Sequence, residues 1–127
     1  MRLVLDTSIL IDHLRGRPKA ATELIPRAIA RGDELWSAEV VRAEVLAGMR
    51  TSEEAATRDL LSVITWVDVD EPLAEAAGAL GRRFLPAHQG IEVTDLIVAA
   101  LTQHLGASLK TTNLKHFPMF AGLKAPY

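Results

Sequence analysis

Short apolar runs separated by longer helical patterns constrain the fold of this chain more than any other feature. Such runs occur at residues 3–5, 34–36 and 64–67, residues 108–112 are interpreted as a last strand, and one or two amphipathic segments lie between each pair. Strands that alternate with helices predict an α/β domain with a mainly parallel sheet, because a helical crossover returns the chain to the same direction. We therefore predict a three-layer architecture in which helices flank the sheet.

The helices are predicted from apolar periodicity and from the residues at their boundaries. They are expected near residues 9–16, 20–30, 38–50, 52–62 and 72–85, with a last helix that ends at Gly106. Ser37 stands where an N-cap residue belongs, and Thr94 is placed to cap the last helix. Residues 96–101 of that helix are apolar on every side, which predicts that it is buried.

Length and composition narrow the class of protein. A chain of 127 residues suits one domain, predicted here to span residues 1–127. The absence of cysteine excludes disulfides, thiolate metal sites and a cysteine nucleophile. No apolar run is long enough to span a bilayer, and the first residues lack a signal-peptide core, so we expect no membrane association and a cytoplasmic location.

The formal net charge of −2 limits how this chain could bind nucleic acid. Proteins that neutralise phosphates usually carry a basic excess. Either the chain binds no nucleic acid, or its basic residues are segregated from an acidic cluster.

Carboxylates interrupt the apolar elements at three positions. Asp6 closes the first strand, where ligands of open parallel sheets usually bind, although an N-cap role would also explain it. Glu44 flanks the apolar stripe of its helix, and a salt bridge to Arg42 or Arg50 is the alternative explanation. Asp95 lies in the first turn of the buried helix; with Thr94 as the cap, we expect that Asp95 is not needed for capping.

Asn113 follows the last strand and would alone indicate only a turn. Together with Asp6, Glu44 and Asp95, however, it belongs to a set expected at one edge of the sheet. Oxygen ligands without His or Cys favour Mg²⁺ or Mn²⁺, and such a site hydrolyses phosphodiesters.

Four segments of the chain resemble the motifs of the PIN-domain family, specifically those of its VapC-type toxins. These segments are residues 3–12, Ser37 with Glu44 and Gly48, residues 94–100, and residues 111–117. They span nearly the whole chain in the family's order. The resemblance implies a PIN-like fold and a metal-dependent endoribonuclease that is the toxin of a type II toxin–antitoxin pair. It also implies a homodimer and a cognate antitoxin that blocks the site.

The resemblance further assigns roles to individual residues. Asp6, Glu44 and Asp95 would form the acidic triad that holds the metal, and Asn113 would occupy the fourth catalytic position, where the family has Asp or Asn. An amide brings no charge, which argues against a second, tightly held ion. Two hydroxyls, those of Thr7 and Thr111, would support the site.

Three further polar residues near these motifs are interpreted as structural or solvent-exposed: Asp12, Glu92 and His116. Two rival functions remain. The first is a PIN-like module that binds RNA or protein without cutting, for which Asn113 is the best support. The second is a signalling domain phosphorylated on Asp6, but no acidic pair precedes that residue. Support for a dinucleotide-binding fold is weaker still, because no glycine-rich turn follows the first strand.

Overall fold

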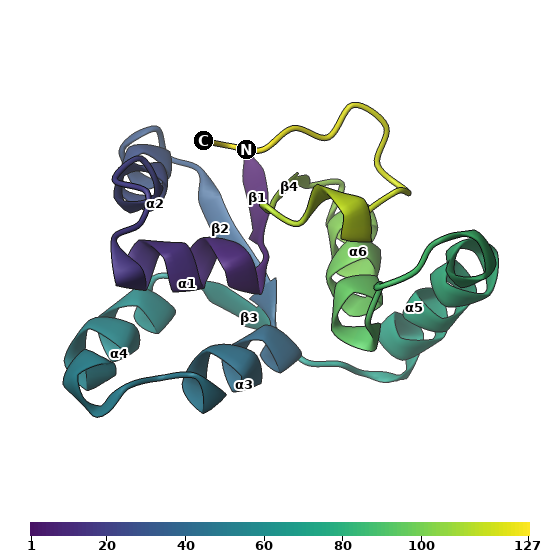
Figure 1. Ribbon diagram of the computed structural model, residues 1–127, viewed down its shortest axis with the longest axis horizontal. Helices are drawn as coiled ribbons and strands as arrows, with labels where there is room; N and C mark the ends of the chain where they lie inside the picture. The colour runs from purple at the N-terminus through teal and green to yellow at the C-terminus, as the bar shows by residue number, and fades with distance from the viewer.

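A computed structural model describes residues 1–127 and contains one sheet between two groups of helices (Figure 1). The strands are β1 (Arg2–Leu5), β2 (Glu34–Ala38), β3 (Thr65–Val67) and β4 (Ser108–Lys110). Their order is β3-β2-β1-β4, and all neighbouring pairs are parallel. The predicted α/β fold with a mainly parallel sheet is confirmed.

Six α-helices flank the sheet, together with three short 3₁₀ turns. The α-helices are α1 (Thr7–Arg15), α2 (Ala21–Ala30), α3 (Glu39–Ala47), α4 (Glu54–Ser62), α5 (Glu71–Phe84) and α6 (Val93–Leu105), and the turns are η1 (Thr51–Glu53), η2 (Leu85–Ala87) and η3 (Leu114–His116). In Figure 1, α1, α2 and α4 lie to the left of the sheet, α3 lies below it, and α5 and α6 lie to its right. Helix α1 contacts α2, α3 and α4, whereas α6 packs on β1, β2 and β4 with α5 against it. No helix is both long and apolar enough to cross a membrane.

The core is built on β1 and α6. Residues 3–5 of β1 are at most 1% exposed, and residues 96–102 of α6 are all buried, as predicted for that helix. Phe117, beyond the last strand, is also 1% exposed. Burial of a side chain of this size contributes about 1.5–3 kcal/mol, so the segment that follows β4 is anchored to the domain.

Both predicted helix caps are wrong. Ser37 lies inside β2, where it pairs in register with Trp66 of β3, and its Oγ donates to the carbonyl of Leu5 at 2.8 Å. The strand therefore continues one residue further, and Ala38 becomes the N-cap of α3. Thr94 lies within α6, whose N-cap is Glu92. Strand pairing with β3 moves the first boundary by one residue, whereas the local capping box of Glu92 and Asp95 moves the second by two.

Candidate active site

An open cavity of about 470 Å³ lies where β1 and β4 end. It contains every predicted catalytic residue and Thr7. The lining residues are Asp6, Thr7, Ser8, Ile11, Asp12, Glu44, Glu92, Asp95, Thr112, Asn113 and His116. Thr111 is fully buried and supports the cavity from the interior. Residues that are far apart in the sequence are thus brought together at the edge of the sheet that the strand ends predicted.

Asp6 lies deepest in this arrangement, with 2% of its surface exposed. Its backbone N–H donates to the carbonyl of Lys110 at 3.0 Å, which fixes the end of β1 against β4. Its Oδ2 accepts a 2.7 Å hydrogen bond from Thr111 and a longer one, 3.4 Å, from Ser8. Burial nevertheless raises the pKa of Asp6, because these hydrogen bonds only partly offset the loss of water around the carboxylate.

The two hydroxyls beside Asp6 also hold the segment that leaves β4. Ser8 Oγ accepts from the backbone N–H of Thr112 at 3.1 Å, and Thr111 Oγ1 accepts from that of Asn113 at 3.0 Å. Ser8 was not among the predicted site residues. Its position in the run Asp6-Thr7-Ser8, directly after the first strand, was the signal that could have identified it.

Glu44 reaches the cavity from α3 and is half-buried. Its Oε1 accepts a 2.7 Å hydrogen bond from Thr7 Oγ1 at the start of α1. The alternative of a salt bridge is wrong, because Arg42 pairs with Glu39 and Glu44 has no cationic partner. Glu44 therefore presents a carboxylate whose remaining oxygen is free to accept another ligand.

Asp95 is 8% exposed and lies in the first turn of α6. Its Oδ2 accepts the backbone N–H of Glu92, the N-cap residue, at 2.9 Å. The expectation that Asp95 is not needed for capping is therefore wrong: the residue both caps α6 and faces the cavity. Burial raises the pKa of Asp95, and the nearby charges of Asp6 and Glu92 raise it further.

His116 also lies in the site, although it was interpreted from the sequence as structural or solvent-exposed. It lies in η3, and its Nδ1 is 3.1 Å from Asp95 Oδ2, although the ring N–H is not directed for a hydrogen bond. The contact is therefore electrostatic when the imidazole is protonated. Asp12 and Glu92, interpreted as structural or solvent-exposed, also line the cavity, and Asp12 accepts a 2.8 Å hydrogen bond from the hydroxyl of Tyr127.

The donor set of this cavity fits a divalent cation. Five carboxylates line it, those of Asp6, Asp12, Glu44, Glu92 and Asp95, and no lysine or arginine does. Like charges that are partly buried repel one another, and a hard cation with oxygen ligands relieves that repulsion. No three acidic or histidine side chains form a closed coordination shell as they stand. The oxygen donors are therefore of the kind that holds a hard divalent cation, although they do not form a preformed cage.

Known proteins resemble this chain along its whole length. The model of the PIN domain family matches residues 3–121. Ribonuclease VapC19 of Mycobacterium tuberculosis is 45% identical over all of both chains. Ribonuclease VapC10 of the same organism is 36% identical over 98% of this chain and 92% of its own length.

Solved structures share the fold. A chain of a toxin–antitoxin complex from Klebsiella pneumoniae superposes with a TM-score of 0.80 and 27% identity, covering 98% of both chains. A chain of VapBC2 from Rickettsia felis, solved with a DNA fragment from its promoter, gives a TM-score of 0.76 at 21% identity, covering 98% of this chain and 97% of that one. At that identity the second likeness concerns the fold alone.

Proposed function

Because this chain belongs to the PIN-domain family, and within it to the VapC-type ribonuclease toxins of VapBC systems, we propose that it is a metal-dependent endoribonuclease that acts at the carboxylate cavity. The proposed catalytic residues are Asp6, Glu44, Asp95 and Asn113. The observation that carries the proposal is the convergence of Asp6, Glu44 and Asp95 on one cavity that no lysine or arginine lines.

Asp6, Glu44 and Asp95 are the proposed ligands of Mg²⁺ or Mn²⁺. When bound, such an ion lowers the pKa of a coordinated water and neutralises charge on the phosphate. Burial raises the pKa of Asp6 and of Asp95, and a bound cation would offset this cost of burying their charges, which supports the assignment.

Neighbouring side chains with hydroxyl groups hold these carboxylates in place. Thr111 and Ser8 orient Asp6, and Thr7 orients Glu44, in each case through a hydroxyl that donates to the carboxylate. Fixed ligands matter for hydrolysis, because a displacement of even about 1 Å reduces the rate strongly.

Asn113 is exposed at the mouth of the cavity, and its side chain has no hydrogen-bond partner within the chain. Its amide is therefore free to contact the RNA backbone. With water as the nucleophile and no side-chain nucleophile in play, we expect products that end in 5′-phosphate and 3′-hydroxyl.

The proposed partners are RNA as the substrate and a cognate antitoxin as the inhibitor. The structural neighbours include a chain from a toxin–antitoxin complex, which supports an antitoxin partner. A homodimer is also proposed, from family membership, and light scattering coupled to size-exclusion chromatography would test it.

The deciding experiment is cleavage of total cellular RNA by the purified protein with Mg²⁺, Mn²⁺ or EDTA. Asp6→Asn and Asp95→Asn test the site, and Asp59→Asn is the matched control, because Asp59 is an exposed residue of α4 outside the cavity. We expect discrete, metal-dependent fragments that are lost in both site variants and retained in the control. Absence of cleavage by the folded wild-type protein with either metal would instead favour the non-catalytic binding module.

A further inference from the structure

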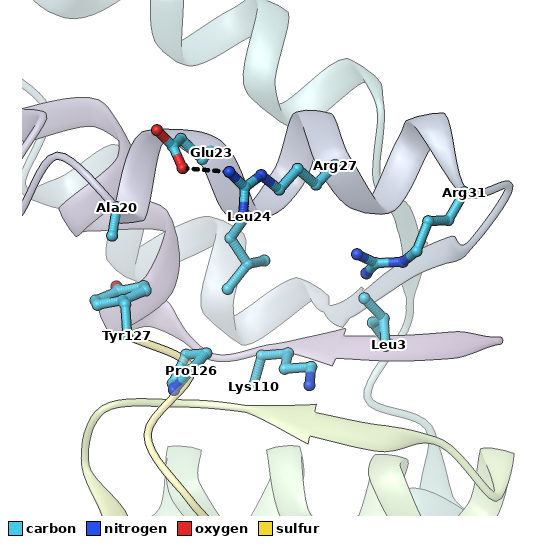
Figure 2. A pocket seen from close by; sticks show the side chains of 9 residues that line it. All are labelled: Leu3, Ala20, Glu23, Leu24, Arg27, Arg31, Lys110, Pro126 and Tyr127. Atoms are coloured by element: carbon cyan, nitrogen blue, oxygen red, sulfur yellow. Dashed lines mark ion pairs between the residues drawn. The ribbon is translucent and has the colours of Figure 1, made fainter.

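A second, chemically opposite pocket lies on the α2 side of the sheet. It has a volume of about 270 Å³ and is lined by Leu3, Ala20, Glu23, Leu24, Arg27, Arg31, Lys110, Pro126 and Tyr127 (Figure 2). Three of these residues are cationic and one is acidic. The pocket is therefore basic in a chain whose net charge is −2. These three basic residues lie outside the carboxylate cavity, an arrangement that one of the two sequence-based alternatives requires.

The cations of this pocket differ in whether they form ion pairs. Arg27 pairs with Glu23 at 2.9 Å, and Arg31 pairs with Asp33, also at 2.9 Å. Lys110 forms no ion pair, although it is only partly exposed. In Figure 2, Arg31 extends from α2 toward β1, and the amine of Lys110 lies beside β1 and β4. Lys110 is therefore the cation of this pocket whose charge is not neutralised by an acidic side chain.

Part of the wall of this pocket is apolar. Leu3 and Leu24 lie between the cations, and Pro126 and the ring of Tyr127 line the end near Ala20 (Figure 2). The hydroxyl of Tyr127 is bonded to Asp12, which fixes the position of the ring. A fixed aromatic ring beside an unpaired cation is a combination that binds single-stranded nucleic acids, with bases stacked on rings and phosphates on cations.

The pocket and the carboxylate cavity are built on the same elements. Lys110 directly precedes Thr111, which holds Asp6, and Tyr127 contacts Asp12, which lines the cavity. The cavity itself carries five carboxylates and repels phosphates. An RNA strand that reaches it therefore needs a cationic contact nearby.

We propose that this basic pocket binds one nucleotide of the RNA strand outside the cleaved bond, with its phosphate on Lys110 and Arg31 and its base against Tyr127. The proposal rests on the proposed ribonuclease function for its choice of RNA as the occupant. The mixed polar and apolar lining favours a nucleotide over an acidic side chain of a partner protein, which would leave the apolar wall uncovered.

The first test is an NMR titration of the ¹⁵N-labelled full chain with AMP in EDTA, which needs no catalysis. We expect shifts of amides in residues 27–31, at Lys110 and near Tyr127. Lys110→Gln should weaken AMP binding roughly tenfold, the effect of losing one charge-assisted contact. Arg82→Ala is the control, because Arg82 is an exposed cation of α5 with no ion pair and lies outside the pocket.

The second test measures binding of a fluorescent RNA oligonucleotide to Asp6→Asn protein at several salt concentrations. Adding Lys110→Gln should lower the slope of log affinity against log salt by about 0.7, whereas Arg82→Ala should not. If neither AMP nor RNA perturbs the pocket, the proposal is wrong, and an acidic protein partner becomes the better occupant. RNA cleavage without pocket binding overturns this inference alone. Pocket binding without cleavage supports it and overturns the proposed function.

Discussion

Thr7 Oγ1 donates a 2.7 Å hydrogen bond to Glu44 Oε1, and this bond joins the first turn of α1 to α3. Thr7 directly follows Asp6, so the same short segment that supplies one carboxylate of the site also positions a second. The two helices converge at the cavity, and the relative placement of the two carboxylates depends on this contact.

Replacing Thr7 with valine keeps the shape of the side chain and removes the donor. We expect the free energy of unfolding to fall by about 1 kcal/mol, the net contribution of one hydrogen bond. RNA cleavage should fall more, by at least roughly tenfold, because Glu44 loses its orientation. Thr7→Ser retains the hydroxyl and should stay near wild-type activity. Equal activity of the valine and serine variants would show that Glu44 is placed by other contacts.

Asp6→Asn should stabilise the metal-free protein at neutral pH. Burial raises the pKa of Asp6 in the folded state above its ordinary value of 3.8. As the pH rises from 3.8 through the folded pKa, the unfolded chain releases its proton first, so the wild-type protein loses stability. The Asn side chain of the variant does not ionise, so the variant does not lose stability in this way. Thermal unfolding in EDTA should therefore give the variant a higher Tm at pH 7, and the difference should disappear below pH 3.8. A lower Tm of the variant at both pH values would contradict the prediction.

Mn²⁺ should stabilise the wild-type protein against heat. A ligand that binds only the folded state adds about 2.7 kcal/mol at roughly a hundred times its Kd. The effect should weaken as the pH is lowered, because the raised pKa values of Asp6 and Asp95 make protons compete with the ion. Asp95→Asn should lose most of the stabilisation, and Asp59→Asn should keep it. Equal stabilisation by Mn²⁺ in all three proteins would indicate that the ion binds outside the carboxylate cavity.

Tyr127 should remain protonated in the folded protein well above pH 10. Burial raises its pKa from the ordinary value of 10.0, and the hydrogen bond to Asp12 raises it further. Because Tyr127 is the only tyrosine, the phenolate absorbance of the whole protein reports this residue alone. Above pH 10 the unfolded chain ionises while the folded chain does not, so stability should fall as the pH rises.

The control for that titration is Asp12→Asn, which should lower the pKa of Tyr127 without bringing it back to 10, since burial is the larger cause. Circular dichroism recorded in parallel separates ionisation from unfolding. Phenolate absorbance that appears at pH 10 while the protein is still folded would mean that the ring is neither buried nor bonded to Asp12 in solution.

The sequence predicted the fold and the edge where the carboxylates meet because both depend on regular features. Asp6 and Asn113 follow strands, and the carboxyl ends of parallel strands share one edge. What failed depended on contacts across the fold. Ser37 stays in its strand because β3 pairs with it, and no local pattern signals that partner.

The role of His116 was hidden for a related reason, whereas the capping role of Asp95 depends on a local contact with Glu92. A histidine in a closing turn has no periodicity that would assign it to a site, and only the packing of η3 brings it to Asp95. Asp95 fills the N3 position of α6 because the helix starts two residues earlier than a cap at Thr94 suggested. The contact of Asp12 with Tyr127 joins residues that are separated by 115 positions, a distance at which sequence patterns carry no information.

The central position of β1 has a consequence for synthesis. This first strand pairs with β4, and Asp6 receives its hydrogen bond from Thr111, so the site requires segments from both ends of the fold. A nascent chain has β1 long before β4 emerges from the ribosome. We therefore expect that the growing polypeptide is inactive and that its own messenger is not cut while β4 is still untranslated. Because β4 is translated after β1, we expect nuclease activity only late in the translation of the chain.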